Sequence, residues 1–325
     1  MSQPCAVSTL TPEAERITHR ILALLLPHRR TLERDTHLDT TDAFPEQLKQ
    51  LGDFVRNNEQ VIFSVPGFPC KSPNPDKVFN HLPDHGERLA LRSLHSLCLE
   101  IEKVYAPGAR LLICSDGHIF GDVIGVPDEH IDAYGDELRA MIHAEGLADH
   151  LGTFDLRDVY GPDLSYDEKR RTAAENLGPS VEELRAEVRG NDSTLRMYRG
   201  ITRFLVEDTS DWEGSRSALQ RECRRRAYEV ILRSRAWSEL IGECHPRNVR
   251  LSIHPQNRGE EKFGIRLLDA GDAWMTPWHS VPLRRTDGTW ELMHRHDAQK
   301  VGREVHRDGR PSHFEAIGDD IGRPS

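Results

Sequence analysis

The pattern of apolar and polar residues predicts strands that alternate with helices along the chain. Residues 61–65 form a short apolar run ended by Pro66 and Gly67, which is typical of a strand. Residues 87–105 carry apolar side chains at helical spacing, and residues 109–114 are apolar except for Arg110. This alternation indicates an α/β fold, with helices packed around a central sheet.

Further elements follow from the same signals. Thr11 and Pro12 mark the start of a helix that runs to about residue 26. We expect other helices at residues 45–56, 128–145 and 215–241, charged helices and loops within 161–194, and strands at 201–206, 249–253 and 263–268. The segment after Met293 shows no periodicity. The expected organisation is therefore a helical segment (1–56), an α/β catalytic domain (57–293) and an irregular tail (294–325).

Composition narrows the classes of partner. The chain has 325 residues, 37% of them hydrophobic and 30% charged, as in globular proteins, and a formal net charge of -10. Such a charge disfavours nucleic acid as a partner, although a local basic pocket can still bind a small anion. No run of eighteen apolar residues is present, so we expect no membrane span and a cytoplasmic location.

The six cysteines are scattered and form no CxxC pair. A disulfide framework or a structural zinc site is therefore not expected. Cys98 and Cys114 lie in apolar surroundings and are predicted to be core thiols.

Candidate chemistry gathers after three predicted strands, because ligands in α/β sheets bind at the carboxyl ends of strands. The first loop, residues 67–77, is not a Walker loop, since Cys70 precedes Lys71 and prolines at 66, 69, 73 and 75 remove backbone donors. It is a stiff loop suited to bind one phosphate or carboxylate, or else a solvated turn. Asp84 and Glu87 match a helix capping box.

The second loop follows residue 114 and carries Ser115, Asp116, His118 and Asp122. A carboxylate beside an apolar core can be tuned for acid/base work, although Asp116-Gly117 could also close a hairpin. In the third region Arg250, Ser252 and His254 alternate, so they share one face of a strand. Burying such a polar face is costly unless it binds something. Trp278 and His279 add an aromatic ring and a titratable ring.

Taken together, these segments resemble the pyoverdine/dityrosine biosynthesis family, the isonitrile synthases. The resemblance rests on FPCKSPNPDKVFNHLPDHGERLAL, YAPGARLLICSDGHIFGDVIGVPD, VRLSIHPQ and TPWHSV, which occur in this order between residues 63 and 281. It implies a Rossmann-like fold and a reaction without metal or redox cofactor. Members of the family condense the amine of L-tyrosine or L-tryptophan with the C2 ketone of D-ribulose 5-phosphate. Carbon–carbon cleavages then leave C2 as the isocyanide carbon.

The resemblance also suggests roles for the candidate residues. The catalytic candidates are Lys71, Asp116, Asp122, His254 and His279. The candidates for substrate binding are Ser72, Asn74, Lys77, Ser115, Phe120, Arg250, Ser252 and Trp278. Among these, Lys71, Lys77 and Arg250 would hold the phosphate, while Phe120 and Trp278 would line the aromatic pocket. A downstream iron/2-oxoglutarate oxygenase acting on the product is the implied functional partner.

Three alternatives stay open at this point. A family variant could form an N-formyl amino acid instead of an isocyanide. A metal-dependent hydrolase would account for the 17 histidines, but HExxH or a comparable spacing is missing. A non-catalytic phosphosugar-binding protein would need the same cations. The choice between tyrosine and tryptophan depends on a few side chains in three dimensions.

Overall fold

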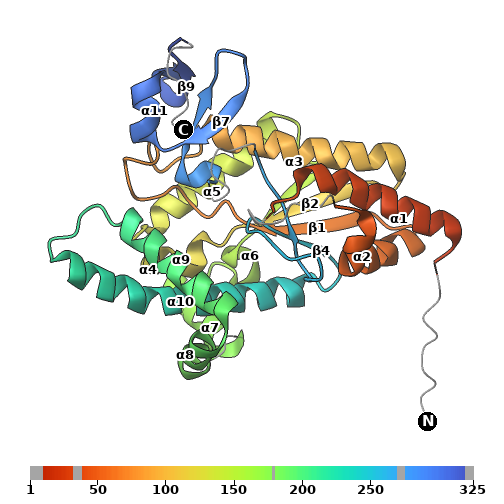
Figure 1. Cartoon of the computed structure of the whole chain (residues 1–325), viewed down its shortest axis with the longest axis horizontal. Coiled ribbons are helices and arrows are strands. Elements are labelled where there is room, and N and C mark those ends of the chain that lie inside the picture. The colour runs from red at the N-terminus through yellow and green to blue at the C-terminus, as the bar shows by residue number, and fades with distance from the viewer. Residues whose placement is uncertain (1–9, 32–38, 178–179, 269–274, 319–325) are drawn as a thin grey trace.

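The computed structural model describes residues 10–31, 39–177, 180–268 and 275–318. At its centre lies a five-stranded sheet of order β3-β2-β1-β4-β5 whose neighbouring strands are all parallel (Figure 1). The strands are β1 (Val61–Pro66), β2 (Ala109–Cys114), β3 (Leu151–Phe154), β4 (Val249–Ser252) and β5 (Phe263–Gly264). The predicted α/β, Rossmann-like fold is confirmed, although the strand predicted at 263–268 keeps only two residues.

One face of this sheet packs against the N-terminal helices (Figure 1). Here α1 (Pro12–Leu25), α2 (Pro45–Arg56), α3 (His85–Val104) and α5 (Asp128–Ala144) contribute to the same hydrophobic cluster as β1 and β2. Thr11 caps α1, and Asp84 forms a capping box with Glu87 at the start of α3, as predicted. The first 56 residues therefore help to build the main core.

The other face packs against the long helix α10 (Arg216–Cys244), whose Trp237 lies against Phe154. Around α10 lie α4 (Gly117–Ile124), α6 (Leu156–Tyr160), α7 (Tyr166–Leu177), α8 (Val181–Gly190) and α9 (Asp192–Asp208). The prediction of charged helices within 161–194 is confirmed.

The strand predicted at residues 201–206 is wrong, because this segment belongs to α9. The β-branched and aromatic residues there favour a strand by local propensity. However, Asn191 caps the helix, and Tyr198, Ile201 and Leu205 recur at helical spacing in the cluster shared with α10. Tertiary packing thus outweighs the local preference.

The prediction of an irregular tail after Met293 is also wrong. The segment forms α11 (Arg295–Val301), β8 (Gly302–Arg307) and β9 (Arg310–Ala316), which join β6 (Val281–Arg284) and β7 (Trp290–Met293). These strands make a second sheet of order β7-β6-β9-β8. Asp308 and Gly309 both adopt positive φ (52° and 77°), as a two-residue hairpin turn requires.

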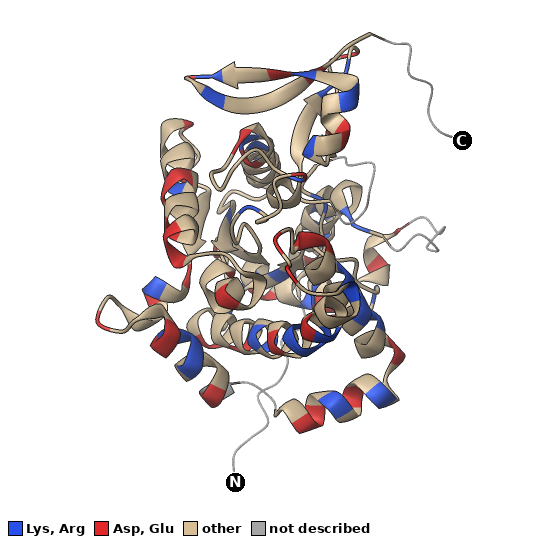
Figure 2. Cartoon of the chain, turned by 90° about the vertical axis from the view of Figure 1, so that its left-hand side faces the viewer, with Lys and Arg blue, Asp and Glu red and all other residues tan. Residues whose placement is uncertain are grey.

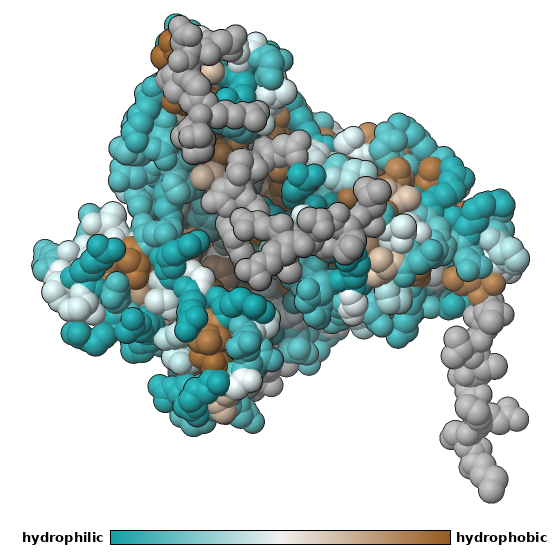
Figure 3. All heavy atoms as spheres, in the orientation of Figure 1, coloured by the Kyte–Doolittle hydropathy of each residue, from teal (hydrophilic) through white to brown (hydrophobic). Residues whose placement is uncertain are grey.

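Short 3-10 turns complete the structure: η1 (Leu26–His28), η2 (Thr41–Ala43) and η3 (Pro277–His279). Cys98 and Cys114 are buried, as predicted, whereas Cys5 lies outside the described residues. In the part of the chain that the structure describes, no helix has the length and apolar character to cross a bilayer. The visible surface is largely hydrophilic (Figure 3), and acidic and basic residues are interspersed along the helices (Figure 2).

Candidate active site

The strand order defines where a ligand site should lie. The order reverses between β1 and β4, and in open α/β sheets the ligand crevice forms outside the carboxyl ends of the strands at this switch point. Gly67 follows β1 there: a Cβ on it would lie 3.1 Å from Trp278 and 3.6 Å from Ile253. The absence of a side chain at Gly67 therefore lets the loops after β1 and β4 meet η3.

The loop after β2 joins the same place. The Ser115 hydroxyl donates to the carbonyl of Phe68 at 2.8 Å. A Cβ on Gly117 would come within 2.1 Å of the Pro69 carbonyl oxygen, so only glycine allows this contact between α4 and the first loop. The three strand-end segments thus converge.

Lys71 lies in this region, but its ammonium group is fully engaged. Its Nζ lies 2.7 Å from Asp84 Oδ2 and 2.9 Å from Glu87 Oε2, and it donates to the Pro277 carbonyl at 2.9 Å. The side chain is buried. Although burial favours loss of the proton, the two carboxylates raise the pKa of Lys71. Because an ammonium has three donors, none remains for a phosphate, and this part of its predicted role is not supported.

Lys77 is neutralised as well. Its Nζ lies 2.5 Å from Asp208 Oδ1 at the end of α9, and the other oxygen of Asp208 is buried without a hydrogen-bond partner among the described residues. Asn74 Nδ2 donates to the Glu207 carbonyl at 2.8 Å, and the Ser72 hydroxyl accepts from the Asn74 N–H at 3.2 Å. The first loop thereby binds the end of α9.

His279 stands next to this ion pair. Its Nδ1 is 3.0 Å from the Thr276 hydroxyl, and its ring meets Phe204 edge-on with centroids 4.8 Å apart. Burial, with Lys77 and Lys71 nearby, lowers the pKa of His279 to about 3. The imidazole is therefore neutral near pH 7, where it can accept a hydrogen bond but is too weak a base to hold a proton.

The predicted pair of aromatic rings is not formed. Trp278 packs on Phe68 at a centroid distance of 5.0 Å, within the main core cluster. Phe120 lies against the cluster of Trp237 on the α10 face instead. Phe68 and Phe204 are the aromatic neighbours of η3.

The two aspartates of the second loop differ sharply. Asp116 Oδ1 is buried without a hydrogen-bond partner among the described residues, and burial raises the pKa of this carboxyl to about 7. Asp122 lies further along α4, where it pairs with Arg233 at 2.5 Å and Arg170 at 3.5 Å. Asp116 has the environment of an acid/base group, whereas Asp122 joins α4 to α10 and α7.

The residues of the third region also differ in their surroundings. The Ser252 hydroxyl accepts from the backbone N–H of His254 at 3.1 Å and from Gln256 Nε2 at 3.2 Å. Arg250 donates to Ser238 of α10, and its nearest carboxylate is Glu261 at 3.4 Å. Arg250 therefore faces α10 and does not join Lys71 at the switch point.

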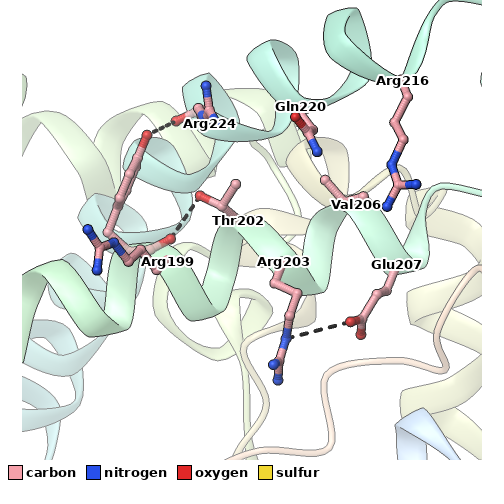
Figure 4. A pocket seen from close by; sticks show the side chains of 9 residues that line it. Arg199, Thr202, Arg203, Val206, Glu207, Arg216, Gln220 and Arg224 are labelled. Carbon is pink, nitrogen blue, oxygen red and sulfur yellow. Dashed lines mark hydrogen bonds and ion pairs between the residues drawn. The ribbon is translucent and has the colours of Figure 1, made fainter.

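Two hollows lie beside α9. A pocket of about 320 Å³ opens beside Lys77 and is lined by Asn74, Asp76, Lys77, Glu207, His294, His296 and Asp297. A groove of about 520 Å³ runs between α9 and α10, where Arg203 pairs with Glu207 at 3.5 Å (Figure 4). Among the described residues, no group of three or more His, Cys, Asp or Glu is arranged to hold a metal.

Sequence reasoning missed several of these residues. Asp208 lies just beyond the segment 201–206 that was predicted as a strand, and His294 opens the tail predicted to be irregular. The backbone N–H groups of Arg295 and His296 donate to the carbonyls of Lys77 and Asp76, at 3.1 and 2.8 Å. The Asp308-Gly309 turn was the one local signal that could have indicated an ordered C-terminal sheet.

The fold and site define an α/β protein with a buried polar centre at the switch point of a parallel sheet. The family model of pyoverdine/dityrosine biosynthesis proteins matches residues 51–305, and the chain belongs to this family.

Characterised relatives extend over nearly the whole chain. The L-tryptophan isonitrile synthase AmbI2 of Fischerella ambigua is 42% identical over 93% of this chain and 92% of its own length. The L-tyrosine isonitrile synthase of Pseudomonas aeruginosa is 43% identical over 82% of this chain and 83% of its own. The crystal structure of PvcA from the same species superposes with a TM-score of 0.85 at 40% identity, covering 92% of this chain and 99% of that one.

Proposed function

We propose that this protein is an isonitrile synthase that converts the amino group of L-tyrosine or L-tryptophan into an isocyanide, with D-ribulose 5-phosphate as carbon donor. The observation that carries the proposal is the similarity to isonitrile synthases for both amino acids over more than four fifths of the chain. The N-formyl alternative has less support, because these relatives, similar over most of the chain, are named isonitrile synthases.

The geometry supports particular roles. Condensation of the amine with the C2 ketone loses water and needs a group that can exchange protons near neutral pH. Asp116, whose pKa burial raises to about 7, is suited to this step, and neutral His279 can accept a hydrogen bond. An iron/2-oxoglutarate oxygenase would then act on the isocyanide.

The test is a product assay with each amino acid in turn. The protein is incubated with D-ribulose 5-phosphate and L-tyrosine, L-tryptophan or L-phenylalanine, and products are read by mass spectrometry and by the isocyanide stretch in the infrared. We expect an isocyanide from tyrosine or tryptophan. A formamide as the primary product would favour the N-formyl alternative, and the absence of any product would contradict the proposed activity.

A further inference from the structure

The geometry points to a phosphate-binding subsite made by Arg250, Lys262 and Ser238, between β4, β5 and α10. This inference rests on the proposed function for the identity of its ligand, the phosphate of a sugar phosphate. It assigns the phosphate to this subsite and not to Lys71 and Lys77, whose charges are already balanced within the protein.

Two cations meet at one hydroxyl group in this subsite. Arg250 Nη2 lies 2.5 Å from Ser238 Oγ and 3.1 Å from the Ser238 carbonyl oxygen, and Lys262 Nζ lies 3.0 Å from the same Oγ. The register of β4 with β5 pairs Leu251 with Phe263, so Arg250 of β4 lies level with Lys262, the residue that precedes β5. Because Ser238 Oγ accepts from both cations, its own proton remains available for a third partner.

The positive charge here is weakly compensated. Among the described residues, the one carboxylate within ion-pair distance of Arg250 is Glu261, 3.4 Å away, and 59% of its side chain is exposed. No ion pair to Lys262 is present in the described part of the chain, although Glu261 and Glu239 act on it from a distance. Burial, together with the charge of Arg250, lowers the pKa of Lys262.

An anion would relieve this repulsion. A phosphate dianion can accept charged hydrogen bonds from a guanidinium and from an ammonium, and a further bond from a hydroxyl. Arg250, Lys262 and Ser238 supply this set of donors. In contrast, Lys71 faces two buried carboxylates, so an added dianion there would meet net negative charge.

Ser252 and His254 relate the subsite to the candidate active site. Ser252 follows Arg250 on the same face of β4, and its hydroxyl holds the backbone of His254. Arg30 and Lys262 act electrostatically on His254. His254 in turn acts electrostatically on His279. A sugar phosphate bound at Lys262 could therefore extend along His254 towards His279.

The test compares a phosphorylated with an unphosphorylated ligand. Calorimetric titrations of the full chain with D-ribulose 5-phosphate, D-ribulose and inorganic phosphate are carried out for the wild type, Lys262→Met, Lys262→Arg and the control Lys103→Met. Lys103 is exposed and pairs with Glu100 of its own helix. We expect Lys262→Met to lose roughly 10- to 100-fold in affinity for ribulose 5-phosphate, as removal of one charged hydrogen bond predicts.

The unphosphorylated ligand and the conservative variant show whether the effect comes from the phosphate and from the charge of residue 262. Affinity for D-ribulose should be unchanged in Lys262→Met, and Lys262→Arg should recover most of the affinity for the phosphorylated sugar. Wild-type affinity of Lys262→Met for both ribulose 5-phosphate and phosphate would overturn the subsite. If the wild type binds phosphate through Lys262 yet forms no isocyanide, the proposed function fails while the subsite stands. Circular dichroism of each variant shows that the fold is retained.

Discussion

Burial decides which ionisable side chains can exchange protons near neutral pH in this molecule. Asp116 loses its hydration and has no hydrogen-bond partner for Oδ1 among the described residues, which raises the pKa of its carboxyl to about 7. The same cause lowers the pKa of His279 to about 3. Burial and the nearby Asp116 and Asp208 raise the pKa of the Cys70 thiol, which stays protonated. Asp116 is thus the best candidate for general acid/base catalysis.

Replacement of Asp116 by asparagine tests this assignment. The amide is close to the carboxyl group in shape but cannot transfer a proton, so kcat should fall roughly 100- to 10,000-fold. The measurement is the steady-state rate of product formation from the preferred amino acid. Asp122→Asn, in the helix α4 that follows Asp116, is the matched control and should retain most of the activity. Equal losses in both variants would contradict a special role for Asp116.

The same variant has a predicted effect on stability. An acid whose pKa is raised on folding, here from 3.8 to about 7, destabilises the fold progressively as the pH rises between these values and by a constant amount above them. Asp116→Asn removes this cost. The free energy of unfolding of the variant, relative to that of the wild type, should therefore increase between pH 4 and pH 7. Urea denaturation at several pH values measures this difference. A difference that does not change with pH would contradict the assignment.

Residue types could be predicted from the sequence, but their partners could not. Gly67, Lys71, Asp116 and His279 were found because they follow buried strands or carry titratable groups. That Lys71 is neutralised by carboxylates thirteen and sixteen positions later depends on how the loop folds back onto α3. Local sequence holds no information on that contact.

Elements are joined around the site by buried ion pairs. Lys71 links the loop after β1 to the first turn of α3 and, through the Pro277 carbonyl, to η3. Lys77 links the same loop to the end of α9 through Asp208. A loop held at two points by buried charges is fixed relative to the sheet, which explains how its prolines and lysines can be part of a rigid site.

Lys71→Met tests the role of the first of these links. Loss of the ammonium leaves Asp84 and Glu87 buried without their cation, which we expect to cost about 3 to 5 kcal/mol of unfolding free energy. Chemical denaturation at pH 8 measures this loss. The exposed control Lys103→Met should change stability by less than about 0.5 kcal/mol. Full stability of Lys71→Met with lost turnover would instead support a direct catalytic role.

Helices and strands were predictable where local pattern and tertiary packing agree. β1, β2, α2 and α3 appear within two residues of the predicted bounds, because an apolar run covered on both faces, or a capped amphipathic stretch, has one stable arrangement. The strand predicted at 201–206 is wrong, because packing against α10 holds these strand-forming residues in a helix. The strand predicted at 263–268 is confirmed only in part, because β5 has two residues, which pair with β4.

At the scale of the whole molecule, the site depends on strand order and on the C-terminal sheet. The parallel order places the loops after β1, β2 and β4 at one edge, which α/β alternation and the family resemblance together made predictable. The tail could not be predicted from periodicity, because β8 is mostly polar and the buried residues of β9, Ser312, His313 and Phe314, are consecutive and do not alternate. Yet α11 docks on the loop at Asp76 and Lys77, so this helix and His294 before it line the pocket.

The fate of the sugar carbon C2 tests the account most directly. The protein is incubated with [2-¹³C]ribulose 5-phosphate and the preferred aromatic amino acid, and the product is analysed by ¹³C NMR and mass spectrometry. The account predicts that the label appears in the isocyanide carbon. An isocyanide without the label, or a labelled sugar phosphate recovered unchanged after full incubation, would contradict it.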